Sequence, residues 1–418
     1  MNRFKKIIRR CNLKKKIILL PFIIFMIFML TSCSVSFGIP DENIEEGTVI
    51  TKGKIVDGFR YNTDYAAFDT ETTISEIISE SSVNTIDDDE FFIEEILNNM
   101  TVHQKIAQMI LARCPSDAEE QMKKYQFGGY TLYGRDFKWE TPSSVKKRIE
   151  NIQSNAIIPS FIAVDEEGGN IVRISNNTAF AKNPFLSPQN MLKNNALEED
   201  TNEKSRLLLS LGINFNLAPV ADVTENKSDY MYSRTFGLPA GETGEYIADI
   251  VEIMNDNGLA SCLKHFPGYG SNVDTHTGIA VDTRSKSEFE ENDFIPFEYG
   301  INAGCSAVLI NHNIINAYND SLPASLAPEI HDVLRNELGF DGVIVTDDLG
   351  MDAIKLYSGS DNINVLAVLA GNDLLCVTDS IDCYNDIIKG YNDGIISEER
   401  LDESVRRILK MKKQYGII

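Results

Sequence analysis

Short apolar runs alternate with longer amphipathic stretches from about residue 91 to the end of the chain. Runs such as GVIVTD are rich in β-branched residues, whereas stretches such as SVKKRIENIQSN repeat their apolar positions with the period of a helix. The apolar runs predict eight strands, at residues 108–113, 128–133, 161–166, 213–219, 260–266, 306–312, 342–347 and 373–378.

Strands that alternate with helices pair in parallel, and a nearly continuous Val, Ile and Leu content is typical of strands buried on both faces. Eight β/α units need roughly 250 residues or more to close into a barrel, and this part of the chain is long enough. We therefore predict an α/β fold, a single TIM-type (β/α)8 barrel over residues 91–418. The alternative is an open doubly wound sheet, but no GxGxxG motif opens an early helix.

The N-terminus has a different pattern. Residues 1–16 carry eight basic side chains, and the apolar run IILLPFIIFMIFML follows them directly. This order is typical of an export signal, and the short run with its proline disfavours a permanent transmembrane helix. The run ends in LTSC, which resembles a bacterial lipobox. That resemblance implies a signal peptide over residues 1–32, cleavage before Cys33 and lipidation of the Cys33 sulfur, whereas the alternative is an uncleaved signal anchor.

Residues 33–90 are predicted to form a lipid-bearing Cys followed by a flexible tether. Residues 34–90 hold 14 acidic and 3 basic side chains, and a segment of this composition cannot bury enough apolar surface to offset its chain entropy. Either reading of the N-terminus places the rest of the chain outside the cytoplasm. We expect an extracytoplasmic lipoprotein anchored to the cell membrane of a bacterium.

Charge and cysteine usage exclude several classes of function. The formal net charge of −23 argues against a nucleic-acid partner, which would require a surplus of Lys and Arg. The seven Cys residues are scattered singly, without a CxxC pair or Cys/His spacing, so neither a zinc site nor a disulfide framework is indicated. We expect no cofactor and no metal.

The active site of such a barrel lies at the C-terminal ends of its strands. Asp347 stands where GVIVT ends, either as a carboxylate at the barrel mouth or as a helix N-cap. With Asp348 beside it, one of the two can cap while the other faces the pocket. Lys264 and His265 close another buried strand. Their alternative roles are a structural ion pair and a hydrogen-bonded core histidine, respectively.

The glycine-rich segment 264–284 carries the pair Asp274 and His276. An Asp and a His two residues apart on an extended loop can face the same side. The carboxylate can then hydrogen-bond the imidazole, raise its pKa and so produce a positioned proton donor and acceptor. An isolated DxH is usually without function, but its place on a loop after a barrel strand favours the catalytic interpretation.

Several motifs together resemble glycoside hydrolase family 3, in its β-N-acetylglucosaminidase branch. They are VDEEGG, INFNLAPVADV, SRTFG, KHFPGYG, DTH, GVIVTDDLGM and SEERLDESVRRIL. The resemblance covers roughly residues 91–418. It implies a retaining glycosidase that removes terminal N-acetylglucosamine from cell-wall fragments or related glycans.

Carried over onto this sequence, the resemblance implies that Asp347 is the nucleophile, His276 the acid/base and Asp274 its partner. It also implies a set of residues that hold the terminal sugar, namely Asp165, Arg234, Lys264 and His265. The partners expected are the N-acetylglucosamine glycan and, through the lipid, the membrane. We expect a monomer.

The sequence departs from the family pattern in three places. It has Gly268-Tyr269-Gly270 where the family usually reads GHG, the loop to Asp274 is one residue shorter, and Asn170 stands where Arg is frequent. None of these changes removes a catalytic group. The alternative functions are a β-glucosidase or other family glycosidase, a phosphorylase or transferase, and a non-catalytic glycan-binding lipoprotein.

Overall fold

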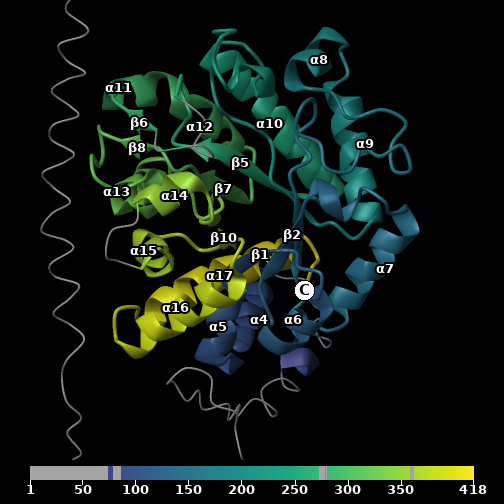
Figure 1. Cartoon of the computed structure of the whole chain (residues 1–418), viewed down its shortest axis with the longest axis vertical. Helices are drawn as coiled ribbons and strands as arrows, with labels where there is room; N and C mark the ends of the chain where they lie inside the picture. Colours follow the sequence, from purple (N-terminus) through teal and green to yellow (C-terminus); the bar gives the residue numbers. More distant parts are fainter. Residues whose placement is uncertain (1–73, 79–85, 273–277, 279, 358–361) are drawn as a thin grey trace, which may run out of the picture. The chain divides into compact units, whose positions relative to one another are not determined.

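The structure of this chain is a computed structural model, and it describes residues 74–78, 86–272, 278, 280–357 and 362–418. The chain divides into two compact units, residues 1–64 and 65–418. All described residues belong to the second unit, which Figure 1 shows in colour. No helix among them is long and apolar enough to span a bilayer.

Eight parallel strands form the centre of this unit and confirm the predicted (β/α)8 barrel. Their order around the sheet is β10-β1-β2-β3-β4-β5-β7-β9. A parallel bridge between Val345 and Leu374 joins the two ends of the sheet, so the barrel is closed. Each strand lies within its predicted range: β1 Ile110–Arg113, β2 Gly129–Leu132, β3 Phe161–Val164, β4 Phe215–Asn216, β5 Ala260–Phe266, β7 Ala307–Ile310, β9 Val343–Thr346 and β10 Leu375–Val377.

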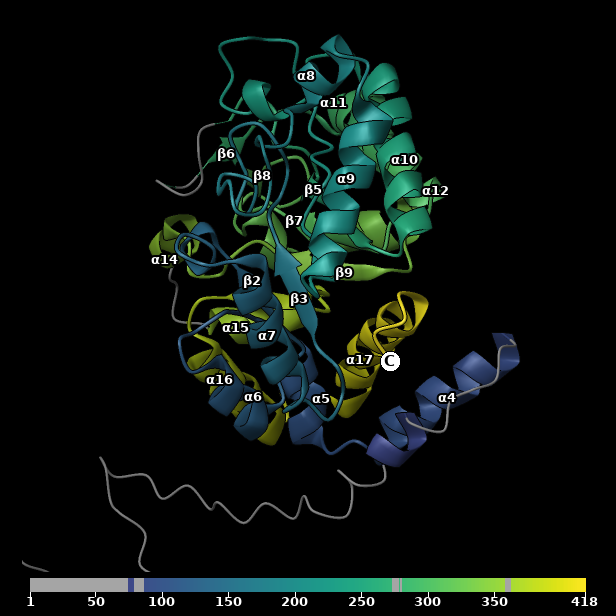
Figure 2. The ribbon, with the colours of Figure 1, turned by 90° about the vertical axis from the view of Figure 1, so that its right-hand side faces the viewer.

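The helices pack around the strands (Figure 2). In α7, Val145, Ile149 and Ile152 recur at helical spacing and are buried, while Thr141 caps the first turn. The α-helical segments described are α4 Ile86–Asn99, α5 Val102–Gln108, α6 Ala118–Tyr125, α7 Pro142–Gln153, α8 Pro188–Lys193, α9 Leu197–Ser210, α10 Ala240–Asn257, α11 Lys286–Glu288, α12 Phe294–Asn302, α13 Pro328–Asp332, α14 Asp352–Tyr357, α15 Ile363–Ala370, α16 Ser380–Asn392 and α17 Glu398–Gln414.

The folded barrel unit includes residues before the predicted boundary at 91. Helix α4 begins at Ile86, inside the segment 33–90 that was assigned to the tether. Ion pairs join it to α17: Arg406 contacts Glu94, and Lys410 lies 3.4 Å from Glu90. The acidic side chains at the end of the predicted tether therefore include ion-pair partners of the last helix.

A second, two-stranded sheet lies beyond the barrel strands and was not predicted. Strand β6, Val281–Asp282, pairs in parallel with β8, Ile314–Ile315. Two residues are too few to give a detectable alternation of apolar and polar positions. This sheet joins the segment after β5 to the segment after β7.

Lys412 of α17 is fully buried at the end of the barrel opposite to the carboxyl ends of the strands. Its Nζ donates to Gln108 Oε1 at 2.7 Å and lies 5.1 Å from the centre of the Phe161 ring. Gln108 precedes β1, and Phe161 begins β3. Burial lowers the pKa of Lys412 to about 7.

Lys412→Met should flatten the dependence of stability on pH above neutrality. The unfolded chain holds the Lys412 proton up to a pKa of about 10.4, whereas the folded chain releases it near pH 7. The unfolded state therefore binds more protons in this interval, and the free energy of unfolding should rise with pH.

Urea denaturation of both proteins at several pH values between neutrality and about pH 10 measures this slope. The exposed Lys123 supplies the control variant Lys123→Met. Equal slopes for wild type and Lys412→Met would show that Lys412 stays protonated in the folded protein.

Candidate active site

Most of the predicted site residues meet at the C-terminal ends of the barrel strands. Asp165 directly follows β3, Lys264 and His265 lie near the end of β5, and Asp347 directly follows β9. Because the strands are parallel, these positions share one mouth. Backbone hydrogen bonds continue the ladder there, since Asp347 N donates to Ile310 O at 3.0 Å.

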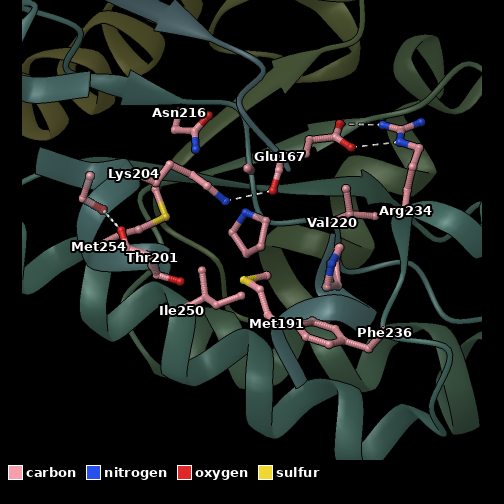
Figure 3. Close-up of a pocket in the computed structure, with 14 residues that line it drawn as sticks. Glu167, Met191, Thr201, Lys204, Asn216, Val220, Arg234, Phe236, Ile250 and Met254 are labelled. Carbon is pink, nitrogen blue, oxygen red and sulfur yellow. Dashed lines mark hydrogen bonds and ion pairs between the residues drawn. The ribbon is translucent and has the colours of Figure 1, made fainter. Parts of the chain in front are cut away.

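The buried Lys264 and the largely buried Arg234 share one carboxylate, Glu167. Lys264 Nζ lies 2.8 Å from Asp165 Oδ1 and 2.7 Å from Glu167 Oε1. Arg234 donates to both oxygens of Glu167, from Nε at 2.9 Å and from Nη2 at 2.6 Å (Figure 3). Two cations thus face two carboxylates, and this four-residue charge network is balanced.

Glu167 and Lys264 stay ionised despite their burial. Burial by itself would raise the pKa of Glu167, but the charges of Lys264 and Arg234 outweigh it and hold that pKa far below its usual range. Burial would lower the pKa of Lys264, and the Asp165 and Glu167 carboxylates raise it instead. Each group keeps the other charged because the surrounding dielectric constant is low.

His265 is held between Asp222 and Arg234. Its Nδ1 lies 2.7 Å from Asp222 Oδ2, and its Nε2 lies 3.2 Å from Arg234 Nη2. A guanidinium can only donate, so Nε2 accepts and Nδ1–H donates to the carboxylate. The contacts therefore favour the neutral Nδ1–H tautomer. Asp222 Oδ1 also accepts the Tyr269 amide at 2.7 Å.

Asp347 lies close to the charge network. Burial raises the pKa of the Cys262 thiol, the nearby Lys264 lowers it, and the charges of Asp165 and Asp347 raise it further. Burial also raises the pKa of the Cys376 thiol, and the charges of Asp348, Asp347 and Asp165 add to this effect. The carboxylates of Asp165 and Asp347 thus act on the same two thiols from β5 and β10.

The tandem aspartates divide their roles. Asp348 Oδ1 accepts the Gly350 amide at 2.8 Å, and its Oδ2 accepts the Thr378 hydroxyl at 2.8 Å. Asp348 thereby ties the turn after β9 to the end of β10. Asp347 Oδ1 accepts the neighbouring Asp348 amide at 2.9 Å, and Asp347 is partly exposed at the barrel mouth.

His276 and Asp274, the predicted acid/base pair, lie outside the described residues, and so does Cys33. The described ends of their segment, 268–272 and 280–284, stand at the same end of the barrel as Asp347, because they follow β5 and contact Asp222 and β8.

The sequence did not single out Glu167 or Arg173. The run VDEEGG places two glutamates after β3, and only their contacts in the structure show that they have different roles. Glu166 accepts the amides of Arg173 and Ile174, at 2.6 and 2.9 Å, and so shapes the loop. Arg173 Nη2 lies 3.5 Å from Asp165 Oδ2, so an arginine three residues after Asn170 reaches the site.

Two hollows differ in what they could hold. Behind Glu167 and Arg234, Figure 3 shows a cavity of about 30 Å³ whose lining includes Met191, Ile250 and Met254; it is too small for a sugar. An open groove of about 500 Å³ lies between the segments that follow β4 and β5. Its volume is in the range of small-molecule sites, and its lining includes Thr224, Asp229, Ser271, Asp282 and Arg284.

The site supplies charged, fixed hydrogen-bonding groups around a partly exposed carboxylate. Such a surface suits a ligand rich in hydroxyl groups. Within the described ranges, no cluster of His, Cys, Asp and Glu side chains could hold a metal ion.

Comparison with known proteins agrees with this chemistry. Residues 101–411 match the model of the glycosyl hydrolase family 3 N terminal domain. A beta-N-acetylglucosaminidase/beta-glucosidase of Cellulomonas fimi is 29% identical over 349 residues, which is 80% of this chain and 61% of that protein. A beta-hexosaminidase of Tolumonas auensis is 30% identical over 269 residues, covering 63% of this chain and 79% of that protein.

Among solved structures, the family 3 β-N-acetylglucosaminidase of a Paenibacillus species superposes with a TM-score of 0.70 at 29% identity. The superposition covers 76% of this chain and 63% of that structure. This chain thus spans less than two thirds of the length of both the Cellulomonas and the Paenibacillus proteins.

Glu167→Gln should destabilise the fold markedly. The variant leaves Lys264 and Arg234 with a single ionised carboxylate, and removing one partner of a buried ion pair costs about 3–5 kcal/mol. Urea denaturation measures the loss, with the exposed Glu252→Gln as the control for a lost surface charge. An unchanged midpoint for Glu167→Gln would mean that the two cations do not depend on Glu167.

Proposed function

We propose that this chain, which belongs to glycosyl hydrolase family 3, is a retaining β-N-acetylglucosaminidase that acts on cell-wall fragments or related glycans. The observation that carries the proposal is the position of Asp347 at the same barrel mouth as the Lys264–Asp165–Glu167–Arg234 network. The names of the relatives support the choice of sugar.

In the proposed first step, Asp347 attacks the anomeric carbon and forms an ester bond while the glycosidic C–O bond breaks. His276, protonated and paired with Asp274, gives its proton to the departing oxygen. The sugar is then held covalently on the enzyme, as retaining glycosidases require. A histidine suits this role because an ordinary pKa of about 6.5 makes it a useful proton donor near neutrality.

In the proposed second step, water attacks the same carbon from the side that the leaving group vacated. His276 accepts a proton from that water, and the bond to Asp347 breaks with its electron pair returning to the carboxylate. Lys264, His265, Arg234 and Asp165 hold the hydroxyl groups of the terminal sugar in both steps. Their fixed charges place donors and acceptors without reorganisation.

Asp347→Asn should abolish detectable turnover of an aryl N-acetyl-β-glucosaminide, because the amide is not a nucleophile. Asp348→Ala should retain the chemistry but lower stability, since it loses the bonds to Gly350 and Thr378. Near-normal activity of Asp347→Asn would refute the assignment. Parallel assays with the aryl glucoside separate the proposed sugar from the β-glucosidase alternative.

Trapping with a 2-fluoro glycosyl inhibitor should label the peptide that contains Asp347, and peptide mass mapping locates the label. This result would identify the nucleophile and show that the reaction passes through a covalent glycosyl-enzyme. A label on another carboxylate would reassign the nucleophile, and hydrolysis with inversion would replace the retaining mechanism.

We further propose that residues 1–32 are a signal peptide and that a lipid on Cys33 anchors the enzyme to the outer side of the cell membrane. Cys33→Ala should move the protein from the membrane fraction and end its labelling by a radioactive fatty acid. A variant that stays in the membrane fraction would favour the uncleaved signal anchor instead.

A further inference from the structure

An ion cluster of two buried carboxylates and a partly buried arginine stands at the base of the segment that carries the predicted acid/base. Arg284 Nε lies 3.1 and 3.0 Å from the two oxygens of Asp282, and its Nη1 lies 2.7 Å from Asp293 Oδ2. Asp282 and Asp293 are both almost fully buried, with 3% and 1% of their surfaces exposed. The guanidinium thus joins the end of the segment to the start of α12.

The incoming end of the segment packs directly on this cluster. A Cβ atom at Gly268 would lie 2.2 Å from Asp293 Oδ1, and one at Gly270 would lie 2.6 Å from Arg284 Nη2. Both glycines have positive φ, of 119° and 57°. Only glycine can bring the backbone this close to the charged groups in these conformations.

The outgoing end is bound to the same cluster and to the barrel. Asn272 Nδ2 donates to Asp282 Oδ2 at 2.7 Å, which links the two ends of the segment through one carboxylate. Asp282 belongs to β6, and its carbonyl accepts the Asn316 amide at 3.0 Å in the β6–β8 sheet. The two ends are therefore held at a fixed separation by one set of charged bonds.

The cluster is also connected to the proposed sugar site. Asp222 accepts the Tyr269 amide with one oxygen and contacts His265 Nδ1 with the other. A displacement of residues 268–272 would consequently move the partner of a sugar-holding residue. A partly buried Arg in contact with two buried carboxylates resists such displacement, because its planar donors bind in a fixed geometry.

We infer that Arg284, held by Asp282 and Asp293, is a positioning residue for protonation of the leaving group. It holds residues 268–272 and 280–284 together, and these two stretches flank His276 in the sequence. This inference rests on the proposed function, in which that segment supplies the acid/base. It predicts a defect confined to the steps that need proton transfer.

The test compares kcat/KM for two N-acetyl-β-glucosaminides with different leaving groups. A dinitrophenolate departs without protonation, whereas a sugar alcohol such as that of chitobiose needs a proton. Arg284→Met should lower kcat/KM for chitobiose by about 10²-fold, the cost of a misplaced catalytic group, and change it little for the dinitrophenyl substrate. Arg284→Lys should recover part of the loss.

Two further variants keep the result interpretable. Arg406→Met removes an arginine of similar exposure that pairs with Glu94 on α4, and it should leave both rate constants unchanged. Asn272→Ala removes only the bond that links the two ends of the segment, and it should reproduce the selective defect if Arg284→Met does not fold.

The inference would be overturned if Arg284→Met and Asn272→Ala lowered kcat/KM equally for both substrates, or for neither. Either outcome would leave the proposed function intact. Wild-type protein that hydrolyses neither substrate would instead refute the proposed function, and the inference with it. The wild-type measurement therefore separates the two failures.

Discussion

The hydrogen bonds between β9 and Leu374 close eight parallel strands into a barrel, and the described site depends on that closure. Thr346 N donates to Leu374 O at 3.1 Å, and Asp373 beside it is a fully buried carboxylate. Asp373 accepts the Ile344 amide at 2.9 Å and contacts Arg335 and Arg407. A charge at the joint between β9 and β10 is thus neutralised by α17 and by the segment before β9.

Closure brings polar groups from distant parts of the chain into one mouth, where their charges must balance. Lys264 and Arg234 would be costly to bury alone, and so would Glu167. Together they stay ionised, each supported by the others. The resulting surface holds donors and acceptors in place before any ligand arrives, which is what recognition and transformation of a sugar would require.

The departures from the family pattern acquire a physical meaning in the structure. Asn170 Nδ2 contacts Ser233 at 3.3 Å, while Arg173 reaches Asp165. Tyr269 stands between two glycines whose backbone lies against Asp293 and Arg284. Its amide binds Asp222, and its ring lies edge-on to His265. The tyrosine that replaces the usual histidine therefore keeps the backbone bond to Asp222 and also packs its ring against His265.

The sequence by itself determined the barrel and its eight strands. It also determined that Asp165, Lys264, His265 and Asp347 would gather at the C-terminal end of the barrel. The apolar periodicity of each segment depends only on nearby residues, and the alternation of strands with helices implies parallel pairing. Both can therefore be recognised in the sequence. Tertiary structure alone distinguished Glu166 from Glu167, brought Arg173 to Asp165 and placed Arg284 between two buried carboxylates. Those assignments depend on which charges meet after burial, and residues as far apart as Glu167 and Arg234 carry no local signal of their pairing.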